Sequence, residues 1–272
     1  MIREARFSIY APQDILDDIA DHVKGDAVSC KNEFGELTID VLENTSAYLY
    51  IRKRIQEEKI ANDFNEFRQY TKKEIENAEF YDLTLLNPWE SEGQTEKSFN
   101  VDYDMSNTCP QCGGGKRLRS DILVQTSKLK NKDIVLLIPS IIVSEKVKRL
   151  IEENCLTGCY FAPVRDYKRH TVEDYYHLVI NNELPALNKS VRIIHVSPWY
   201  CEVCHNRGQI LESEMIYRKT DLQYFKDLNV TKEHFGVATS MQKIVISKRV
   251  RDLFKKEKIR TAYYEPVHFL ND

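Results

Sequence analysis

Residues 141–164 read IIVSEKVKRLIEENCLTGCYFAPV, and residues 244–267 read IVISKRVRDLFKKEKIRTAYYEPV. The two stretches align at an offset of 103 positions without a gap. An internal match of this kind predicts one structural unit that occurs twice in the chain. The matched pairs are Val143 and Ile246, Ser144 and Ser247, Val147 and Val250, Leu150 and Leu253, Tyr160 and Tyr263, Pro163 and Pro266, and Val164 and Val267.

Each stretch has the pattern of a strand, a helix and a second strand. An apolar, β-branched run comes first and favours a strand. The serine after it is placed to cap a helix, because its hydroxyl can accept a hydrogen bond from an amide of the first turn. Apolar residues then recur at helical spacing, which predicts that Leu150 and Leu253 occupy equivalent core positions. We expect the first strand–helix–strand unit within residues 131–190 and the second within 226–272.

Two Cys-x-x-Cys pairs flank the first unit, CPQC at 109–112 and CEVC at 201–204. Each pair places two thiolates on one tight turn, and two pairs supply the four sulfurs of a tetrahedral zinc site. The 88 residues between Cys112 and Cys201 exceed the spacing of a compact zinc ribbon. The entropic cost of closing a loop grows only with the logarithm of its length, and a self-folding insert lowers it further.

The cysteine pairs therefore predict one structural zinc ion per chain in a split zinc ribbon, built from residues 101–130 plus 191–225. The expected ligands are Cys109, Cys112, Cys201 and Cys204.

The remaining thiols and the neighbouring histidine have plainer interpretations. Cys155 and Cys159 align with Lys258 and Ala262, so the repeat requires no thiol there, and we expect ordinary buried or half-buried side chains. The run CEVCH also matches a haem-attachment signature. Covalent haem attachment normally takes place outside the cytosol, and the N-terminal residues contain no apolar run typical of a signal peptide. His205 is interpreted as a solvated residue beside the metal, since four thiolates already suffice.

Composition restricts the class of protein. Hydrophobic residues make up 42% of the 272 residues and charged residues 30%, with a formal net charge of −3. These values are typical of a soluble globular protein and argue against a general polyanion binder. The longest apolar run, IVLLIPSIIV, is interrupted by Pro139 and Ser140, so no membrane span is expected. The chain is expected in the cytoplasm, where seven cysteines indicate metal binding before disulfides.

Outside these motifs the sequence indicates a mixed α+β fold. Residues 1–100 are expected to form an N-terminal α/β segment, with an amphipathic helix over 12–25 and a strand within 34–44. Apolar residues at helical spacing across 57–79 predict a second helix, and residues 165–187 look like a charged connector. Catalytic signatures such as GxSxG, the P-loop, HExxH and the dinucleotide fingerprint are missing from the sequence. We therefore expect that the protein is not an enzyme.

The order of these parts resembles the bacterial double-CXXCG motif proteins. The resembling segments are CPQCG at 109–113, residues 141–164, CEVC at 201–204 and residues 244–267. The resemblance covers roughly residues 105–272, and His205 stands where the family has glycine. The family occurs as multiple paralogues in myxobacteria, and some members are assigned as immunity proteins against toxins delivered between neighbouring cells. The resemblance implies a zinc-stapled immunity-type protein that binds and neutralises a cognate toxin.

A second interpretation is a zinc-ribbon module that binds nucleic acid or a transcription-type complex. The basic runs KRLRS and KLKNK within 116–132 favour it, whereas the acidic net charge argues against it. Protein partners are often held by exposed aromatic side chains. The chain has 15 tyrosines, and Tyr175, Tyr176 and Tyr263 are candidate partner-binding residues, with core packing as the competing role for each.

Overall fold

The structure is a computed structural model that describes residues 2–33, 35–85, 103–104, 106, 108–113, 117–118, 122–124, 126–137, 140–166, 168, 170–196, 199–236, 240–260 and 263–271. These residues form a mixed α+β protein, made mostly of sheets, with six α-helices among them. The chain divides into two compact units, Met1–Asn77 and Ala78–Asp272. In the part of the chain described, no helix is both long and apolar enough to cross a membrane.

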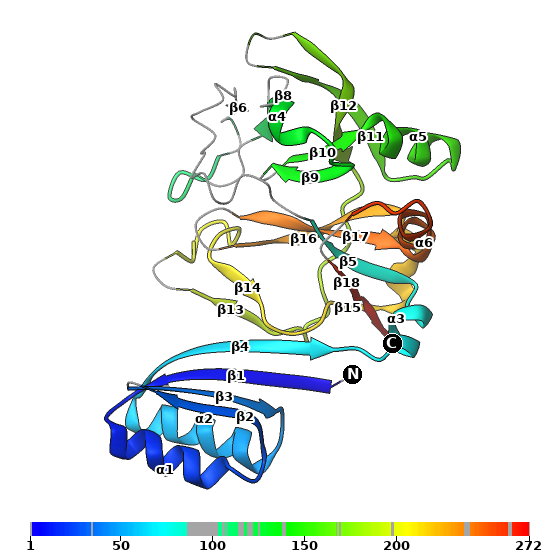
Figure 1. Ribbon diagram of the computed structural model, residues 1–272. Helices are drawn as coiled ribbons and strands as arrows, with labels where there is room; N and C mark the ends of the chain where they lie inside the picture. Colours follow the sequence, from blue (N-terminus) through cyan, green and yellow to red (C-terminus); the bar gives the residue numbers. More distant parts are fainter. Residues whose placement is uncertain are drawn as a thin grey trace. The chain divides into compact units, whose positions relative to one another are not determined.

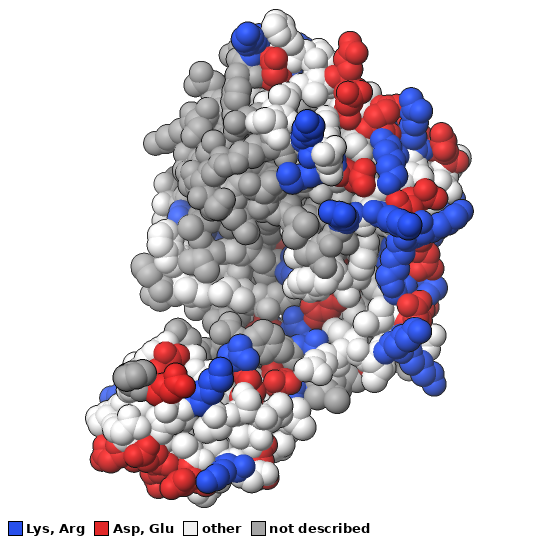
Figure 2. All heavy atoms as spheres, in the orientation of Figure 1, with Lys and Arg blue, Asp and Glu red and all other residues white. Residues whose placement is uncertain are grey.

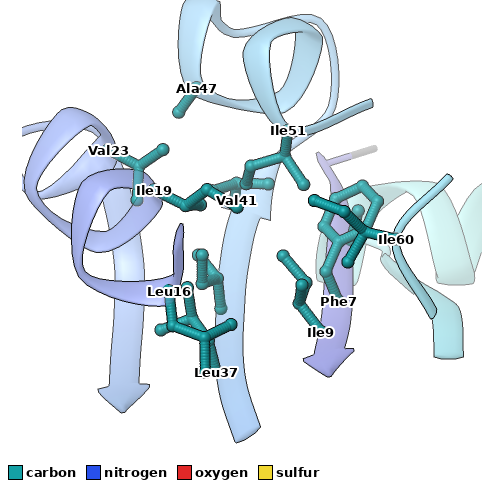
Figure 3. Packing of buried hydrophobic residues seen from close by; sticks show 12 residues of the cluster. Phe7, Ile9, Leu16, Ile19, Val23, Leu37, Val41, Ala47, Ile51 and Ile60 are labelled. Atoms are coloured by element: carbon teal, nitrogen blue, oxygen red, sulfur yellow. The ribbon is translucent and has the colours of Figure 1, made fainter. Parts of the chain in front are cut away.

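The first unit is a four-stranded antiparallel sheet with the order β2-β3-β1-β4 and with α1 and α2 on one face (Figure 1). Alternate residues of β1 and β3 are buried, as expected for strands with one face on a core. Leu16, Ile19 and Val23 of α1 point into the same core (Figure 3). The elements are β1(Ile2–Tyr10), α1(Gln13–Val23), β2(Ala27–Glu33), β3(Glu36–Leu42), α2(Ser46–Glu58), β4(Ala61–Gln69) and α3(Lys72–Asn77).

The predicted helix over 12–25 and strand within 34–44 correspond to α1 and β3, but the helix expected across 57–79 is wrong. That region contains β4, which pairs along its whole length with β1, followed by the short α3. A strand partner more than 50 residues away overrides the local apolar spacing. The helix α2, whose first turn is capped by the Thr45 hydroxyl, was also not expected from the sequence.

The second unit contains two larger sheets with the strand orders β8-β11-β12-β10-β9 and β16-β17-β5-β18. Three two-stranded sheets, β6-β7, β13-β14 and β15-β19, complete it. Its elements are β5(Phe80–Thr84), β6(Tyr103–Asp104), β7(Arg117–Leu118), β8(Ile122–Leu123), α4(Thr126–Leu129), β9(Ile134–Leu137), β10(Ser140–Ser144), α5(Glu145–Glu153), β11(Cys159–Arg165), β12(Thr171–Ile180), β13(Ile193–His195), β14(Gln209–Leu211), β15(Ile216–Arg218), the 3-10 helix η3(Lys219–Tyr224), β16(Leu228–Phe235), β17(Met241–Ser247), α6(Lys248–Lys256), β18(Tyr263–Pro266) and β19(His268–Leu270).

Two central strands differ from the sequence-based expectation. The supposed charged connector contains β12, which lies between β10 and β11 and is antiparallel to both. The expected N-terminal segment 1–100 also contains β5, which lies between β17 and β18 and is antiparallel to both. The boundary between the units therefore falls after Asn77. Residues 86–100 lie outside the described part of the chain.

The helices α5 and α6 bury the expected type of stripe, at slightly different positions. Val147 and Ile151 are buried on α5, and Val250 and Phe254 on α6. Leu150 and Leu253 match each other, but both are half-buried instead of lying in the core. Cys155 is exposed and Cys159 half-buried, so the expectation of burial was wrong for Cys155.

Candidate metal centre

The structure brings the two cysteine pairs together. The sulfur atoms of Cys109, Cys112, Cys201 and Cys204 all lie within 4.8 Å of one another. Across the pairs, the Cys109 and Cys201 sulfurs are 3.7 Å apart, and those of Cys112 and Cys204 are 3.5 Å apart. A tetrahedral ion with bonds of about 2.3 Å to sulfur places its ligands roughly 3.8 Å apart. The cluster therefore has the dimensions of a site for one metal ion.

The first pair lies on a turn that closes on itself. The Gly113 amide donates to the Cys109 carbonyl at 2.9 Å, and Gly113 has a φ of +71°. Glycine adopts this left-handed conformation at no steric cost. Cys109 is buried and Cys112 half-buried, so one sulfur of this pair is shielded from water and the other lies nearer to it.

The second pair repeats this turn with a different residue. The His205 amide donates to the Cys201 carbonyl at 2.9 Å, and His205 has a φ of +55°. His205 thus occupies the position that Gly113 occupies in the first turn, which explains its place in the run CEVCH. Histidine tolerates the left-handed region better than most residues do. The His205 Nδ1 atom lies 2.6 Å from the Tyr200 hydroxyl, so this ring nitrogen already has a hydrogen-bond partner.

A hairpin carries the second turn. The strands β13 and β14 pair, and the Val196 amide donates to the Gly208 carbonyl at 2.8 Å just beyond them. A β-carbon on Gly208 would lie 2.3 Å from the Tyr200 amide nitrogen, so only glycine fits there. The Tyr200 ring stacks on His195 with centroids 3.7 Å apart. These contacts hold the chain on either side of Cys201 in place.

Arg207, which was not expected as a site residue from the sequence, connects the two cysteine turns. Its Nη1 atom donates to the Cys112 carbonyl at 3.1 Å, and its guanidinium lies 5.1 Å from the centre of the Trp199 ring. The available signal was a cation three positions after the second pair.

The electrostatics of the four thiols favour a bound cation. Amide groups of Cys204 and Val203 lower the pKa of Cys201 to about 6, because their hydrogen bonds stabilise a thiolate. Burial among the other sulfurs raises the pKa of Cys204 to about 12. Without a cation Cys204 therefore stays protonated at neutral pH, whereas a divalent ion offsets the repulsion among thiolates. The donor set therefore fits a soft or borderline metal ion.

The three tyrosines proposed as partner-binding residues do not share one environment. Tyr175 packs against the core beneath β10, and its hydroxyl donates to the Leu129 carbonyl at 2.6 Å. Tyr176 is half-buried beneath α5, where the Lys148 ammonium lies 5.0 Å from its ring centre. Tyr263 belongs to the other large sheet and is 56% exposed.

Comparisons with known proteins assign no family to this fold and site. No protein-family model matches the sequence, and no curated protein is significantly similar to it.

Proposed function

We propose that Cys109, Cys112, Cys201 and Cys204 bind one zinc ion with a structural role. The observation that carries this proposal is the four-sulfur cluster, whose members lie within 4.8 Å of one another. Four thiolates fill the tetrahedral coordination of zinc and leave no position open for water or substrate. The ion fastens segments whose paired cysteines are 92 positions apart.

Metal analysis of freshly purified protein tests the zinc proposal. We expect about one equivalent of zinc per chain, lost together with much of the stability in Cys201→Ser, because apparent zinc binding energies reach about 10–16 kcal/mol in small domains. Cys155→Ser is the matched control and should retain the metal, since Cys155 is exposed and outside the cluster. Less than about half an equivalent in the wild type, unchanged by Cys201→Ser, contradicts the proposal.

We also propose that β10–α5–β11 and β17–α6–β18 are two copies of one unit. The Val147 amide donates to the Ser144 hydroxyl at 3.5 Å, and the Val250 amide to the Ser247 hydroxyl at 3.3 Å. Beyond each helix, a residue at the aligned position has a positive φ, +50° at Cys155 and +56° at Lys258. Both helices therefore begin and end in the same way.

The strand register supports the same proposal. Val143 of β10 lies opposite Tyr176 of β12, and the aligned Ile246 of β17 lies opposite Tyr81 of β5. Pro163 also faces Tyr176, and the aligned Pro266 also faces Tyr81. Tyr176 and Tyr81 thus occupy equivalent places in the two sheets.

The contacts between the two helices are reciprocal. The Lys146 ammonium donates to the Glu257 carbonyl at 2.8 Å, at the end of α6. The aligned Arg249 guanidinium donates to the Asn154 carbonyl, at the end of α5. Each helix start therefore binds the other helix end, as in a two-fold dimer whose surfaces are self-complementary.

On this scaffold we propose a cytoplasmic immunity-type protein that binds and neutralises a cognate toxin without catalysis. The order of cysteine turns and strand–helix–strand segments that resembles the double-CXXCG proteins supports this function, and so does a metal site closed to substrate. A zinc-fastened scaffold suits such a role, because a rigid surface loses less entropy on binding.

Co-expression with a toxin encoded next to this chain tests the proposal. Host cells should survive with the wild type and with Cys30→Ser, an exposed cysteine outside the cluster, and should die with Cys201→Ser, which removes a ligand of the proposed zinc. Absence of protection by a correctly folded, zinc-loaded wild type overturns the proposed function.

One observation favours the nucleic-acid alternative. The exposed face of α6 and the turn after it is rich in cations, with Arg249, Lys255, Lys256, Lys258 and Arg260 exposed. Lys and Arg side chains gather, among some acids, where α5 and α6 lie (Figure 2). Phosphate contacts made by such residues weaken steeply as salt increases.

Binding to a short DNA duplex and a short RNA, titrated across salt concentration, tests this alternative. Tight binding that Lys255→Glu and Lys256→Glu abolish favours it over toxin binding. Lys53→Glu, which alters an exposed lysine of α2, is the control for net charge.

A further inference from the structure

A hollow of about 600 Å³ lies between α5 and β11. Its wall on the helix side includes Ile151 and Cys155, and its wall on the strand side includes Cys159, Phe161 and Pro163. The lining is mainly aliphatic and aromatic. The charges at its rim offset each other, since the Lys148 ammonium lies 2.8 Å from a Glu152 carboxylate oxygen. The hollow therefore suits an uncharged, apolar side chain.

The strand that forms one wall has an open edge. On one side β11 pairs with β12 from Cys159 to Arg165, and on the other side β8 reaches only Val164 and Arg165. Within the described ranges, no strand pairs with the outer side of β11 between Cys159 and Pro163. An unpaired strand edge is a template for another extended chain.

The hydrogen-bond pattern shows which backbone groups face that edge. The Asn181 amide donates to the Gly158 carbonyl at 3.0 Å, so Gly158 faces β12. Successive residues of a strand face opposite sides, which places the backbone groups of Cys159, Phe161 and Pro163 at the outer edge. Proline without an amide hydrogen is normally found on such an edge. Phe161 thus presents an amide donor and a carbonyl acceptor beside the hollow, and Cys159 presents its carbonyl, whereas Leu228 covers the outer side of Gly158 and donates to the Thr157 carbonyl at 2.9 Å.

The equivalent place in the other large sheet holds a fully buried side chain. Position 251 aligns with position 148, and the Arg251 side chain lies 4.8 Å from the centre of the Tyr81 ring and is fully buried. Lys148 lies over Tyr176 in the same manner, at 5.0 Å, but remains partly exposed. A buried arginine side chain thus fits at this place beside α6. The hollow beside α5 is therefore a local difference between the two segments.

We propose that the open edge of β11 and the hollow beside it bind an extended peptide segment of a protein partner. The segment adds a strand to the sheet through Cys159 and Phe161 and places an apolar side chain in the hollow. Main-chain hydrogen bonds supply affinity in this mode, and the pocket for an alternate side chain supplies specificity. Identification of the segment with part of a toxin rests on the proposed immunity function, whereas the binding mode does not.

Selection from a phage-displayed library of random linear peptides on the zinc-loaded full-length protein tests the inference. Selected peptides are made with a fluorescent label, and their affinities are measured by polarisation. We expect an apolar residue common to the peptides, and protection of Cys155 from maleimide when a peptide is bound. Failure to enrich any peptide, or an unchanged rate of Cys155 modification, overturns the inference.

Phe161→Pro removes one outward amide donor without touching the pairing with β12. Loss of one hydrogen bond should weaken the selected peptides by about 3- to 10-fold, and loss of packing adds to this. Tyr264→Pro is the matched control, because Tyr264 aligns with Phe161 and contacts Tyr81 at the same 6.3 Å that separates Phe161 from Tyr176. Equal affinities for both variants contradict the proposed edge.

A second variant covers the case in which Phe161→Pro fails to fold. Cys155→Lys copies Lys258, which has the same backbone conformation in the other copy, and places a charged chain in the hollow. We expect it to weaken the binding of the peptides at least as much, and unchanged affinity overturns the inference.

Peptide binding without toxin neutralisation contradicts only the immunity function, whereas neutralisation without peptide binding contradicts only the proposed groove.

Discussion

The segments β10–α5–β11 and β17–α6–β18 each begin their helix with a serine cap and follow it, at the aligned position, with a residue in the left-handed conformation. The two segments differ in the burial of one cationic side chain on the helix. Arg251 is fully buried above Tyr81, whereas Lys148 remains partly exposed above Tyr176 and beside an open hollow. If the two segments are copies of one unit, as proposed, then the same helix face is core in one copy and partly surface in the other, according to the packing of one side chain.

Truncating the two cations gives the largest expected contrast. Arg251→Ala should lower the free energy of unfolding by about 2–5 kcal/mol, because it removes a large buried side chain and leaves a cavity. Lys148→Ala should cost less than about 1 kcal/mol, because much of its side chain can be replaced by water. Urea unfolding of both variants measures the contrast. Equal losses would show that the two helix faces are packed alike.

We expect the strands β12 and β5 to respond differently to acid, because they carry different ionisable groups. Burial lowers the pKa of His177 in β12 to about 4 from an ordinary 6.5. At the equivalent place in β5, Asp82 accepts from the Lys243 ammonium at 2.5 Å, and although burial alone would lower the pKa of Lys243, Asp82 raises it overall.

The direction in which stability changes with pH follows from the lowered pKa of His177. The unfolded chain binds a proton below about pH 6.5 and the folded chain only near pH 4, so stability is complete above 6.5 and falls as pH decreases toward 4. The loss from His177 is up to roughly 3 kcal/mol. Chemical denaturation between pH 7 and 4 should show a smaller loss in His177→Gln than in the wild type. His170→Gln, at a histidine with a 73% exposed side chain, should behave like the wild type.

The serine caps should give nearly equal effects. Ser144→Ala and Ser247→Ala are each expected to cost about 1 kcal/mol, because each removes an acceptor for a first-turn amide. The Ser247 hydroxyl also donates to Asp227 at 2.9 Å, a closer contact than the 3.3 Å from Ser144 to Asp133, so its loss should be slightly larger. Thermal unfolding of the two variants measures both losses of stability. A cost at one serine only would argue against two copies of one unit.

The left-handed residues after the helices should give the smallest effects. Cys155→Gly and Lys258→Gly should each stabilise the protein by up to about 1 kcal/mol, because glycine adopts a positive φ without steric cost. The gain is reduced by the greater freedom of glycine in the unfolded chain. Urea unfolding measures both variants, and a loss of stability at either position would contradict the equivalence of the two helix ends.

The sequence identified the features that depend on neighbours in the chain. The spacing of Leu16, Ile19 and Val23 predicted α1, and the two cysteine pairs predicted the residues that form the four-sulfur cluster. The strands β4 and β5 were missed or misplaced because each owes its conformation to partners far along the chain. Polar residues such as Glu173, Asp174 and His177 concealed β12, since a strand with one partly exposed face carries few apolar residues.

The position of β5 has a consequence for synthesis. Asp82 of β5 bonds to Lys243 of β17, 161 positions later, and β18 on its other side comes later still. At about 5–20 residues per second, a ribosome needs roughly 8–32 s to travel that distance. During this time the nascent chain carries the middle strand of a sheet whose neighbours have not been made. The second large sheet therefore closes only after β17 and β18 have been synthesised, and a ribosome that stalls before them leaves β5 without its neighbours.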